Sequence, residues 1–230
     1  MAISETSLAT ERDTTIAPPH ELDRPEGGFL VLADISGFTA FTTATEIEHG
    51  AAVIGTLLAE VMDALSPPLE IQELEGDAVF ALGPDRVLPL GARLLPLCHR
   101  AYRAFRERRR DLEEDTSCTC GACSSAGMLS LKLIIHHGRF VRQRVGGWSR
   151  VGGPDVILAH LLLKNEVDGE AYILLTSAAL ERLAEDPFAA GARSCTATYP
   201  HFGEVACFVL DLESVGSFFR DGDLQGVAVA

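Results

Sequence analysis

The feature that most constrains the fold is an almost unbroken apolar run at residues 29–34 (FLVLAD), which ends in an aspartate. A continuous apolar run of this length is typical of a β-strand that is buried on both faces. Gly27-Gly28 precedes the run and Ser36-Gly37 follows it, so turn residues bound it on each side. The sequence therefore predicts a buried central strand, and a chain of 230 residues is long enough to supply the core around it.

The rest of the chain alternates between helical and strand patterns. The expected elements after the first strand are a helix from about residue 39, a helix at 51–65, a hairpin of 69–75 with 78–82, a long helix at 89–115, a strand at 129–137 with a hairpin partner at 139–145, a helix at 155–164, a strand at 172–176, a helix at 177–185, and strands at 195–198 and 205–211. This order predicts an α+β sandwich of the ferredoxin-like type, in which helices pack on one face of a mainly antiparallel sheet.

Composition limits the class of protein. Hydrophobic residues make up 47% of the chain and charged residues 23%, which is ordinary for a globular domain. The formal net charge of −14 disfavours a nucleic-acid-binding domain, because such domains are usually basic. The sequence shows neither a run of about 20 apolar residues nor the apolar core of a signal peptide. We therefore expect a cytoplasmic protein with no nucleic-acid or membrane partner.

One folded domain is expected at residues 29–212. Residues 1–28 are polar and acidic and lack a hydrophobic period, which predicts a disordered N-terminal tail. A second tail is expected at 213–230. Residues 116–127 form an insert rich in cysteine, serine and glycine within the domain.

Two aspartates at the predicted strand ends are candidate metal ligands. Asp34 ends the buried strand, and Asp77 lies in the hairpin turn after Gly76. A carboxylate in such a place is costly unless a cation neutralises it, and all-oxygen ligands favour Mg or Mn over Zn. The alternative is that Asp34 caps the next helix and Asp77 is an ordinary turn residue.

Four segments together resemble class III adenylate and guanylate cyclases. These are A-D-I-S-G-F-T at 33–39, E-L-E-G-D-A-V-F-A at 73–81, L-K-L-I-I-H-H-G at 131–138, and the helix at 150–164. The resemblance covers about 29–211. More narrowly, the cysteine insert and V-I-L-A-H-L-L-L-K-N at 156–165 resemble a bacterial family of uncharacterised cyclase-like proteins.

The resemblance implies a cyclase-type fold and a head-to-tail homodimer that binds a nucleoside triphosphate. It implies that Asp34, Asp77 and the backbone carbonyl of Ile35 hold two Mg or Mn ions. The partner protomer would then supply residues for base recognition and for the transition state.

Two positions depart from the family pattern. Ile157 falls where such cyclases carry a catalytic Asn, and Leu161 falls where they carry a catalytic Arg. Neither side chain can donate a hydrogen bond, so weak or no turnover is expected. Arg139, Arg142 and Arg144 of the predicted hairpin, or His160, are candidate substitutes that would contact phosphate. The alternatives are an exposed strand face for the arginines and a packing role for His160.

The base-recognition positions point to guanine. Glu73 falls where adenylate cyclases carry Lys and guanylate cyclases carry Glu, and Arg150 falls where adenylate cyclases carry Asp. Glu73 can accept from the N1–H and the amine of guanine, and Arg150 can donate to its O6. The competing interpretation is an ion pair between Glu73 and Arg150.

Cys118, Cys120 and Cys123 form a compact thiolate cluster. A structural zinc site needs four ligands, so a fourth group would come from His136, His137, Cys98 or a partner chain. Free thiols in a flexible loop are the alternative.

Taken together, these residues predict a cyclase-like domain that binds a metal–nucleotide and lacks efficient turnover. Two alternatives remain open: a working nucleotidyl cyclase that uses substitute cations, and a structural interaction domain stapled by zinc.

Overall fold

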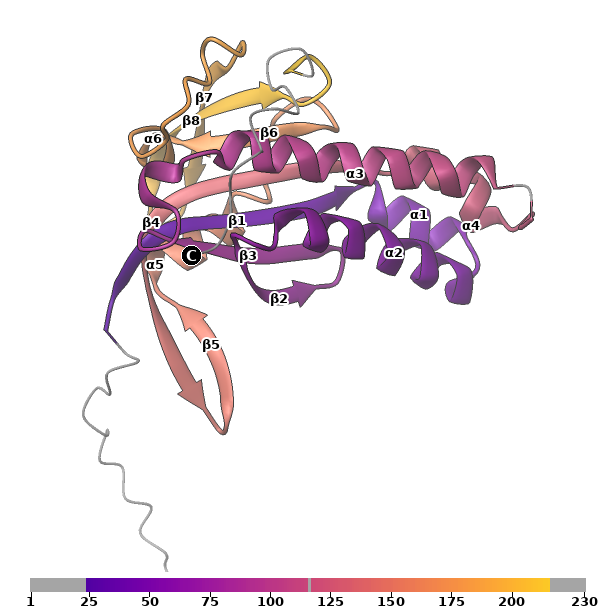
Figure 1. The fold of residues 1–230 in the computed structure, drawn as a ribbon, viewed down its shortest axis with the longest axis horizontal. Helices are drawn as coiled ribbons and strands as arrows, with labels where there is room; N and C mark the ends of the chain where they lie inside the picture. The colour runs from indigo at the N-terminus through magenta and orange to yellow at the C-terminus, as the bar shows by residue number, and fades with distance from the viewer. Residues whose placement is uncertain (1–23, 116, 216–230) are drawn as a thin grey trace, which may run out of the picture.

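The computed structural model describes residues 24–115 and 117–215. These residues form an eight-stranded sheet in the order β2-β3-β1-β4-β6-β8-β7, with β5 paired to β4 outside this path (Figure 1). The strands are β1 (Glu26–Ser36), β2 (Glu70–Glu75), β3 (Ala78–Pro84), β4 (Ser130–Val145), β5 (Trp148–Gly152), β6 (Tyr172–Thr176), β7 (Arg193–Tyr199) and β8 (Gly203–Asp211). Neighbouring strands are antiparallel except β4 and β6, which are parallel. The predicted α+β class with a mainly antiparallel sheet is confirmed.

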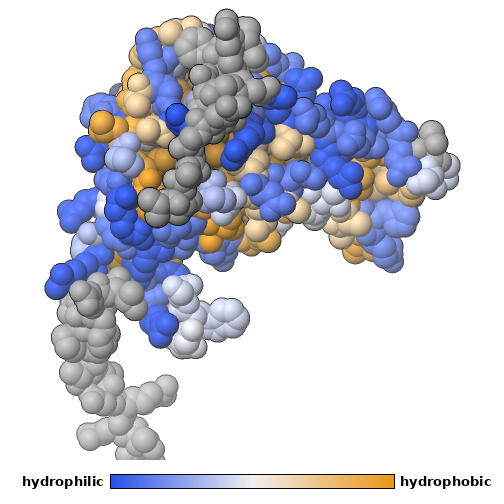
Figure 2. All heavy atoms as spheres, in the orientation of Figure 1, coloured by the Kyte–Doolittle hydropathy of each residue, from blue (hydrophilic) through white to orange (hydrophobic). Residues whose placement is uncertain are grey.

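Two long helices, α2 (Ile47–Leu65) and α3 (Leu94–Glu114), cover one face of this sheet (Figure 1). The shorter helices are α1 (Phe38–Ala44), α4 (Gly121–Ser124), α5 (Pro154–Leu161) and α6 (Ser177–Leu180), and short 3-10 turns lie at η2 (Pro89–Gly91) and η3 (Ala126–Met128). Hydrophilic residues line the outward side of α3 (Figure 2).

The central strand β1 is buried on both faces, as the apolar run predicts. Val31 and Ala33 belong to the hydrophobic cluster beneath α2 and α3. Leu30 and Leu32 belong to a second cluster on the opposite face, where α5 packs. Alternate side chains of a strand point to opposite faces, so β1 divides the core into these two clusters.

The predicted break in the fourth strand is wrong. Residues 130–145 form one continuous strand, β4, and its hairpin partner is β5. Gly138 suggests a turn in the sequence, but the strand continues through it. Glycine is required there because a Cβ would lie 2.4 Å from the Cβ of Asp155 at the start of α5. The actual turn is Gly146-Gly147, whose φ angles of 56° and 88° suit glycine.

Several predicted boundaries also change. The long helix starts at Leu94 and not at Pro89, because Leu90 and Arg93 have positive φ angles that interrupt it. The last helix is the single turn α6, shorter than the predicted 177–185. β1 already begins at Glu26, inside the predicted tail 1–28, and residues 1–23, 116 and 216–230 lie outside the described residues. None of the described helices has the length and apolar character needed to cross a membrane.

Candidate functional site

The fold brings Asp34 and Asp77 together. Asp34 lies near the end of β1, paired in register with Ala78 of β3. The amide of Ile35 donates to the carbonyl oxygen of Asp77 at 3.1 Å, which fixes the β2–β3 turn beside the end of β1. Burial raises the pKa of Asp77, and the charge of Asp34 raises it further. Two carboxylates therefore share one site, where the charge of Asp34 disfavours the ionised form of Asp77.

Lys132 is a part of this site that sequence reasoning missed. It pairs in register with Asp34 across β1 and β4, and its Nζ lies 3.0 Å from Asp34 Oδ2. The two side chains are only 20% and 16% exposed. Lys132 Nζ also donates to the carbonyl oxygen of Leu163 at 3.2 Å. A signal was present, because Lys132 is the single charged residue in the apolar stretch 129–135.

Helix α5 forms a wall of the same site. His160 Nε2 lies 2.8 Å from Glu75 Oε1 at the end of β2, and its Nδ1 lies 2.7 Å from the carbonyl oxygen of Val156. The imidazole ring packs edge-on against Phe80, with 5.0 Å between ring centroids. These contacts give His160 a packing role, and they tie α5 to the strand that leads into Asp77.

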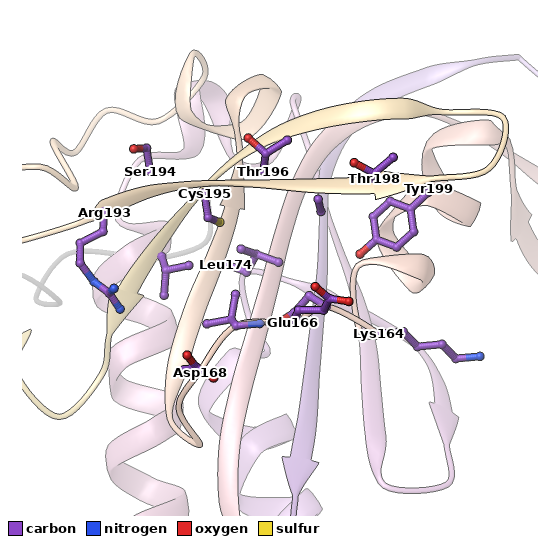
Figure 3. Close-up of a pocket in the computed structure, with 14 residues that line it drawn as sticks. Lys164, Glu166, Asp168, Leu174, Arg193, Ser194, Cys195, Thr196, Thr198 and Tyr199 are labelled. Carbon is purple, nitrogen blue, oxygen red and sulfur yellow. Dashed lines mark hydrogen bonds between the residues drawn. The ribbon is translucent and has the colours of Figure 1, made fainter.

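A pocket of about 460 Å³ opens beside α5, between the loop 164–168 and β7 (Figure 3). The side chain of Tyr199 points into it, and its buried hydroxyl has no hydrogen-bond partner among the described residues. The pocket is lined by charges of both signs, Lys164 and Arg193 against Glu166 and Asp168. No motif predicted this pocket, because loop and strand are distant in sequence.

The pocket and the carboxylates are connected through two side chains. Asn165, at the pocket, accepts a hydrogen bond from the hydroxyl of Tyr172 at 2.9 Å. Tyr172 in turn lies within electrostatic reach of Lys132 and Asp34. The buried Tyr172 thus lies between the pocket and the carboxylates.

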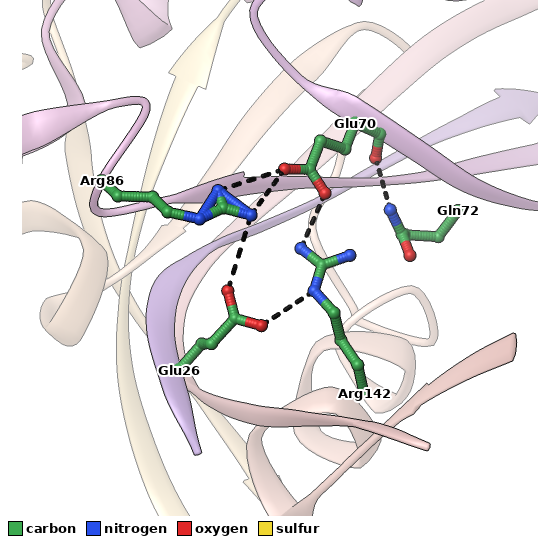
Figure 4. A network of polar contacts seen from close by, with 5 residues as sticks. All are labelled: Glu26, Glu70, Gln72, Arg86 and Arg142. Atoms are coloured by element: carbon green, nitrogen blue, oxygen red, sulfur yellow. Dashed lines mark hydrogen bonds and ion pairs between the residues drawn. The ribbon is translucent and has the colours of Figure 1, made fainter. Parts of the chain in front are cut away.

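Arg142 is held by carboxylates at the base of the β4–β5 hairpin (Figure 4). Its Nε lies 2.8 Å from Glu26 Oε1 and its Nη2 lies 2.6 Å from Glu70 Oε2. Arg86 completes the network, 3.1 Å from Glu70 and 3.7 Å from Glu26. The charge of Arg142 is therefore already neutralised, unlike that of a free phosphate-binding arginine. Arg144 is exposed on the outer part of the hairpin.

Sequence comparison places the chain in a family. The profile of the family described as "Protein of unknown function (DUF2652)" matches residues 54–172. The "Uncharacterized protein Rv2561/Rv2562" of Mycobacterium tuberculosis is 32% identical over 159 residues, which cover 68% of this chain and 72% of that protein. The chain belongs to the DUF2652 family.

Similar solved structures show the fold of this DUF2652 protein. The guanylyl cyclase Cya2 aligns with a TM-score of 0.63 and 15% identity, covering 81% of this chain and 92% of that one. The adenylyl cyclase CyaB from P. aeruginosa aligns at 0.58 and 14%, covering 82% and 95%. The guanylate cyclase domain of RhGC from Catenaria anguillulae, solved in complex with GTP, aligns at 0.59 and 14%, covering 81% and 97%. The fold is that of class III nucleotidyl cyclase domains.

In this DUF2652 protein, the two departures from the cyclase pattern lie on α5. The side chain of Ile157 is 57% exposed. Leu161, one turn later, is half-buried against the second hydrophobic cluster. At these two positions α5 thus presents apolar groups that can neither donate nor accept a hydrogen bond.

Glu73 and Arg150 lie on different elements of the DUF2652 chain. Glu73 is exposed on β2, beside an irregularity in its pairing with β3, and Arg150 is exposed on β5. In the part of the chain that the structure describes, no ion pair joins them within one protomer. Both side chains are available to a ligand or to a second protomer.

The cysteine insert lies beside a histidine that the sequence did not suggest as a candidate ligand. His49 of α2 lies beside Cys118 and Cys120, with 3.7 Å between Cys118 Sγ and His49 Nδ1. The amide of Cys123 and the imidazole of His49 lower the pKa of Cys120 to about 6.

The groups proposed from sequence as a fourth ligand lie elsewhere. His136 contacts Thr176 and Asp155, and His137 contacts Asp85. Cys98 is fully buried in the main core, where burial raises the pKa of its thiol. His49 escaped notice because it precedes Cys118 by 69 residues.

Proposed function

We propose that this DUF2652 chain binds a metal–nucleoside triphosphate at the interface of a head-to-tail homodimer, with weak or no cyclase turnover. The observation that carries the proposal is the pairing of Asp34 with Asp77 at one partly buried place on the sheet. Two such acids are unfavourable without a cation, and a scaffold that binds nothing has no need of them. The RhGC domain, which has the same fold, was solved with GTP.

The residues present suit a hard divalent cation. Asp34, Asp77 and the carbonyl of Ile35 would hold Mg or Mn, since these ions prefer oxygen ligands. Lys132 now neutralises Asp34, but its second partner, the carbonyl of Leu163, can keep the ammonium group when a cation takes over the carboxylate. A bound cation would neutralise the phosphates of the nucleotide and position them.

Weak turnover follows from the side chains on α5. Ile157 and Leu161 cannot stabilise charge on a transferring phosphate, and the loss of one such donor costs about 10²–10³ in rate. Two of the candidate substitutes are already engaged, Arg142 with Glu26 and Glu70, and His160 with Glu75. These contacts favour the nucleotide-binding function over that of a working cyclase.

Preference for guanine rests on Glu73 and Arg150. A carboxylate can accept two hydrogen bonds from guanine but finds only one suitable donor on adenine. Both residues would come from the protomer opposite the one whose carboxylates hold the metal.

Isothermal titration with GTP and ATP, each with and without Mg or Mn, tests this function. Binding should require the metal and favour GTP by about tenfold or more, because a hydrogen bond to a charged group contributes about 1.5–3 kcal/mol. Asp77→Asn should weaken metal-dependent binding by at least about tenfold, since divalent affinity depends on the number of charged ligands. Asp111→Asn, an exposed position on α3, is the matched control and should bind like the wild type.

Each outcome bears on a separate part of the proposal. Equal affinities for GTP and ATP would remove the guanine assignment. Binding that is indifferent to Asp77→Asn would remove the metal site. Rapid formation of cyclic nucleotide by the wild-type protein would favour the working-cyclase alternative.

A further inference from the structure

Four side chains from two distant segments converge at one end of α2. His49 lies in the first turn of α2, and Cys118, Cys120 and Cys123 lie in the connection between α3 and β4. One ligand atom each of His49, Cys118 and Cys120 lies within 4.8 Å of the others. The amide of Cys123 donates to Cys120 Sγ at 3.3 Å, which places Cys123 beside these three residues. Its thiol is the further sulfur that the same segment offers as a fourth ligand.

We propose that His49, Cys118, Cys120 and Cys123 bind one zinc ion in a tetrahedral Cys₃His site. Zinc in structural sites takes four ligands of this kind, and bonds of about 2.3 Å to sulfur and 2.0–2.1 Å to nitrogen place neighbouring ligand atoms about 3.6 Å apart. The 3.7 Å between Cys118 Sγ and His49 Nδ1 is already close to this spacing. The site needs no ligand from a partner chain.

Hydrogen bonds attach the segment that carries the cysteines to the start of α2. The carboxylate of Glu46, the residue before α2, accepts hydrogen bonds from the amides of Gly121 and Ala122, both at 3.2 Å. Ala122 and Ala126 are fully buried in the main core. These anchors hold the cysteines opposite His49 without any metal, so the ligands are pre-organised for binding.

The location of the site indicates a structural role. The connection passes the turn between β1 and α1 so closely that a Cβ on Gly37 would lie 2.8 Å from the carbonyl oxygen of Met128. Zinc would therefore fasten the α3–β4 connection to the start of α2, next to the turn that follows Asp34. The zinc site does not depend on the proposed nucleotide site and is tested by separate measurements.

Elemental analysis of the full chain, purified under reducing conditions without chelators or metal-affinity resin, is the direct test. We expect about one zinc per chain, as four ligands define one structural site. His49→Ala and Cys120→Ser should lose most of the zinc. Cys195→Ser on β7 and His201→Ala in the β7–β8 turn, which change the same residue types outside the cluster, should keep it.

Two further measurements separate coordination from folding. His49→Cys should retain zinc, because four cysteines also form a structural site, whereas a merely structural histidine would not be replaced by a thiol. In the cobalt-substituted protein, Cys123→Ser should reduce the thiolate charge-transfer absorption by about a third, since one of three sulfur ligands is lost. Zinc absent from freshly reduced wild-type protein, or bound equally by the His49→Ala variant, would overturn the proposal.

Discussion

At the scale of single residues, His136 is held as a neutral base inside the protein. It is buried between β4 and β6, with Nδ1 2.8 Å from Thr176 Oγ1 and Nε2 3.4 Å from Asp155 Oδ1. Thr176 Oγ1 also accepts from the amide of Ala179, so this hydroxyl links His136 to the first turn of α6. Burial lowers the pKa of His136, although Asp155 opposes this effect.

This pKa direction predicts that the protein loses stability in mild acid. Below the pKa of an unfolded histidine, about 6.5, the unfolded chain binds a proton that the folded chain resists. The free energy of unfolding should therefore rise with pH up to about 6.5. Above that pH, His136 should add no further change with pH. Urea unfolding at pH 5.5 and 7.5 measures the difference.

Substitution isolates the contribution of this histidine. His136→Gln cannot titrate, so its free energy of unfolding should change less between pH 5.5 and 7.5 than that of the wild type. His201→Gln, an exposed position, should keep the wild-type difference. If His136→Gln and the wild type change equally, the acid sensitivity arises from other groups.

At the scale of elements, α5 should be convertible into a catalytic helix. The double change Ile157→Asn and Leu161→Arg places hydrogen-bond donors at the two positions of α5 that depart from the cyclase pattern. Ile157 is mostly exposed, so an asparagine there buries no polar group. Cyclase activity should rise by about 10²-fold, mainly in kcat, because the new donors act when charge builds up on phosphate.

The half-buried Leu161 is the risk in that design, because an arginine there could leave an unpaired charge in the core. A thermal melt of the double variant checks that it stays folded. The single change Ile157→Asn serves as a control that leaves the core untouched. A folded double variant that binds metal–nucleotide and forms no cyclic product would show that other residues are missing.

The same elements show what the sequence could and could not predict. The β2–β3 hairpin and β6 were readable because their signals are local: two short runs around Gly76-Asp77, and a short apolar run. β4 was misjudged because Gly138 serves a close approach by α5, and nothing local distinguishes that from a turn. Asp34 and Asp77 were foreseen from the cyclase resemblance, whereas Lys132 and His49 gain their partners through pairings about 70–100 residues apart.

At the scale of the whole molecule, the β4–β5 hairpin projects from the body as an arm (Figure 1). Near its tip Trp148 is 81% exposed and pairs in register with Val145, which is 56% exposed. Large exposed apolar side chains on a projecting element mark an interaction site. We expect this arm to contact the second protomer of the homodimer.

Trp148→Ala should therefore weaken dimerisation. A buried tryptophan anchor contributes at least about 2 kcal/mol, so the dissociation constant should rise by about 30-fold or more. Sedimentation analysis over a concentration series measures this change. Ile47→Ala on α2, also a highly exposed apolar position, should dimerise like the wild type. A wild-type chain that is monomeric at all concentrations would exclude the dimer.

The order of strands in the sheet also governs how the chain can fold during its synthesis. β1 lies between β3 and β4, and its pairing with β4 joins residues about 100 positions apart, such as Ala33 and Leu133. At about 5–20 residues per second, a ribosome leaves the most apolar strand without that neighbour for several seconds. In this interval β1 can pair only with β3, which leaves a half-formed sheet with one open apolar edge. This intermediate is the species that chaperones would bind or that would aggregate.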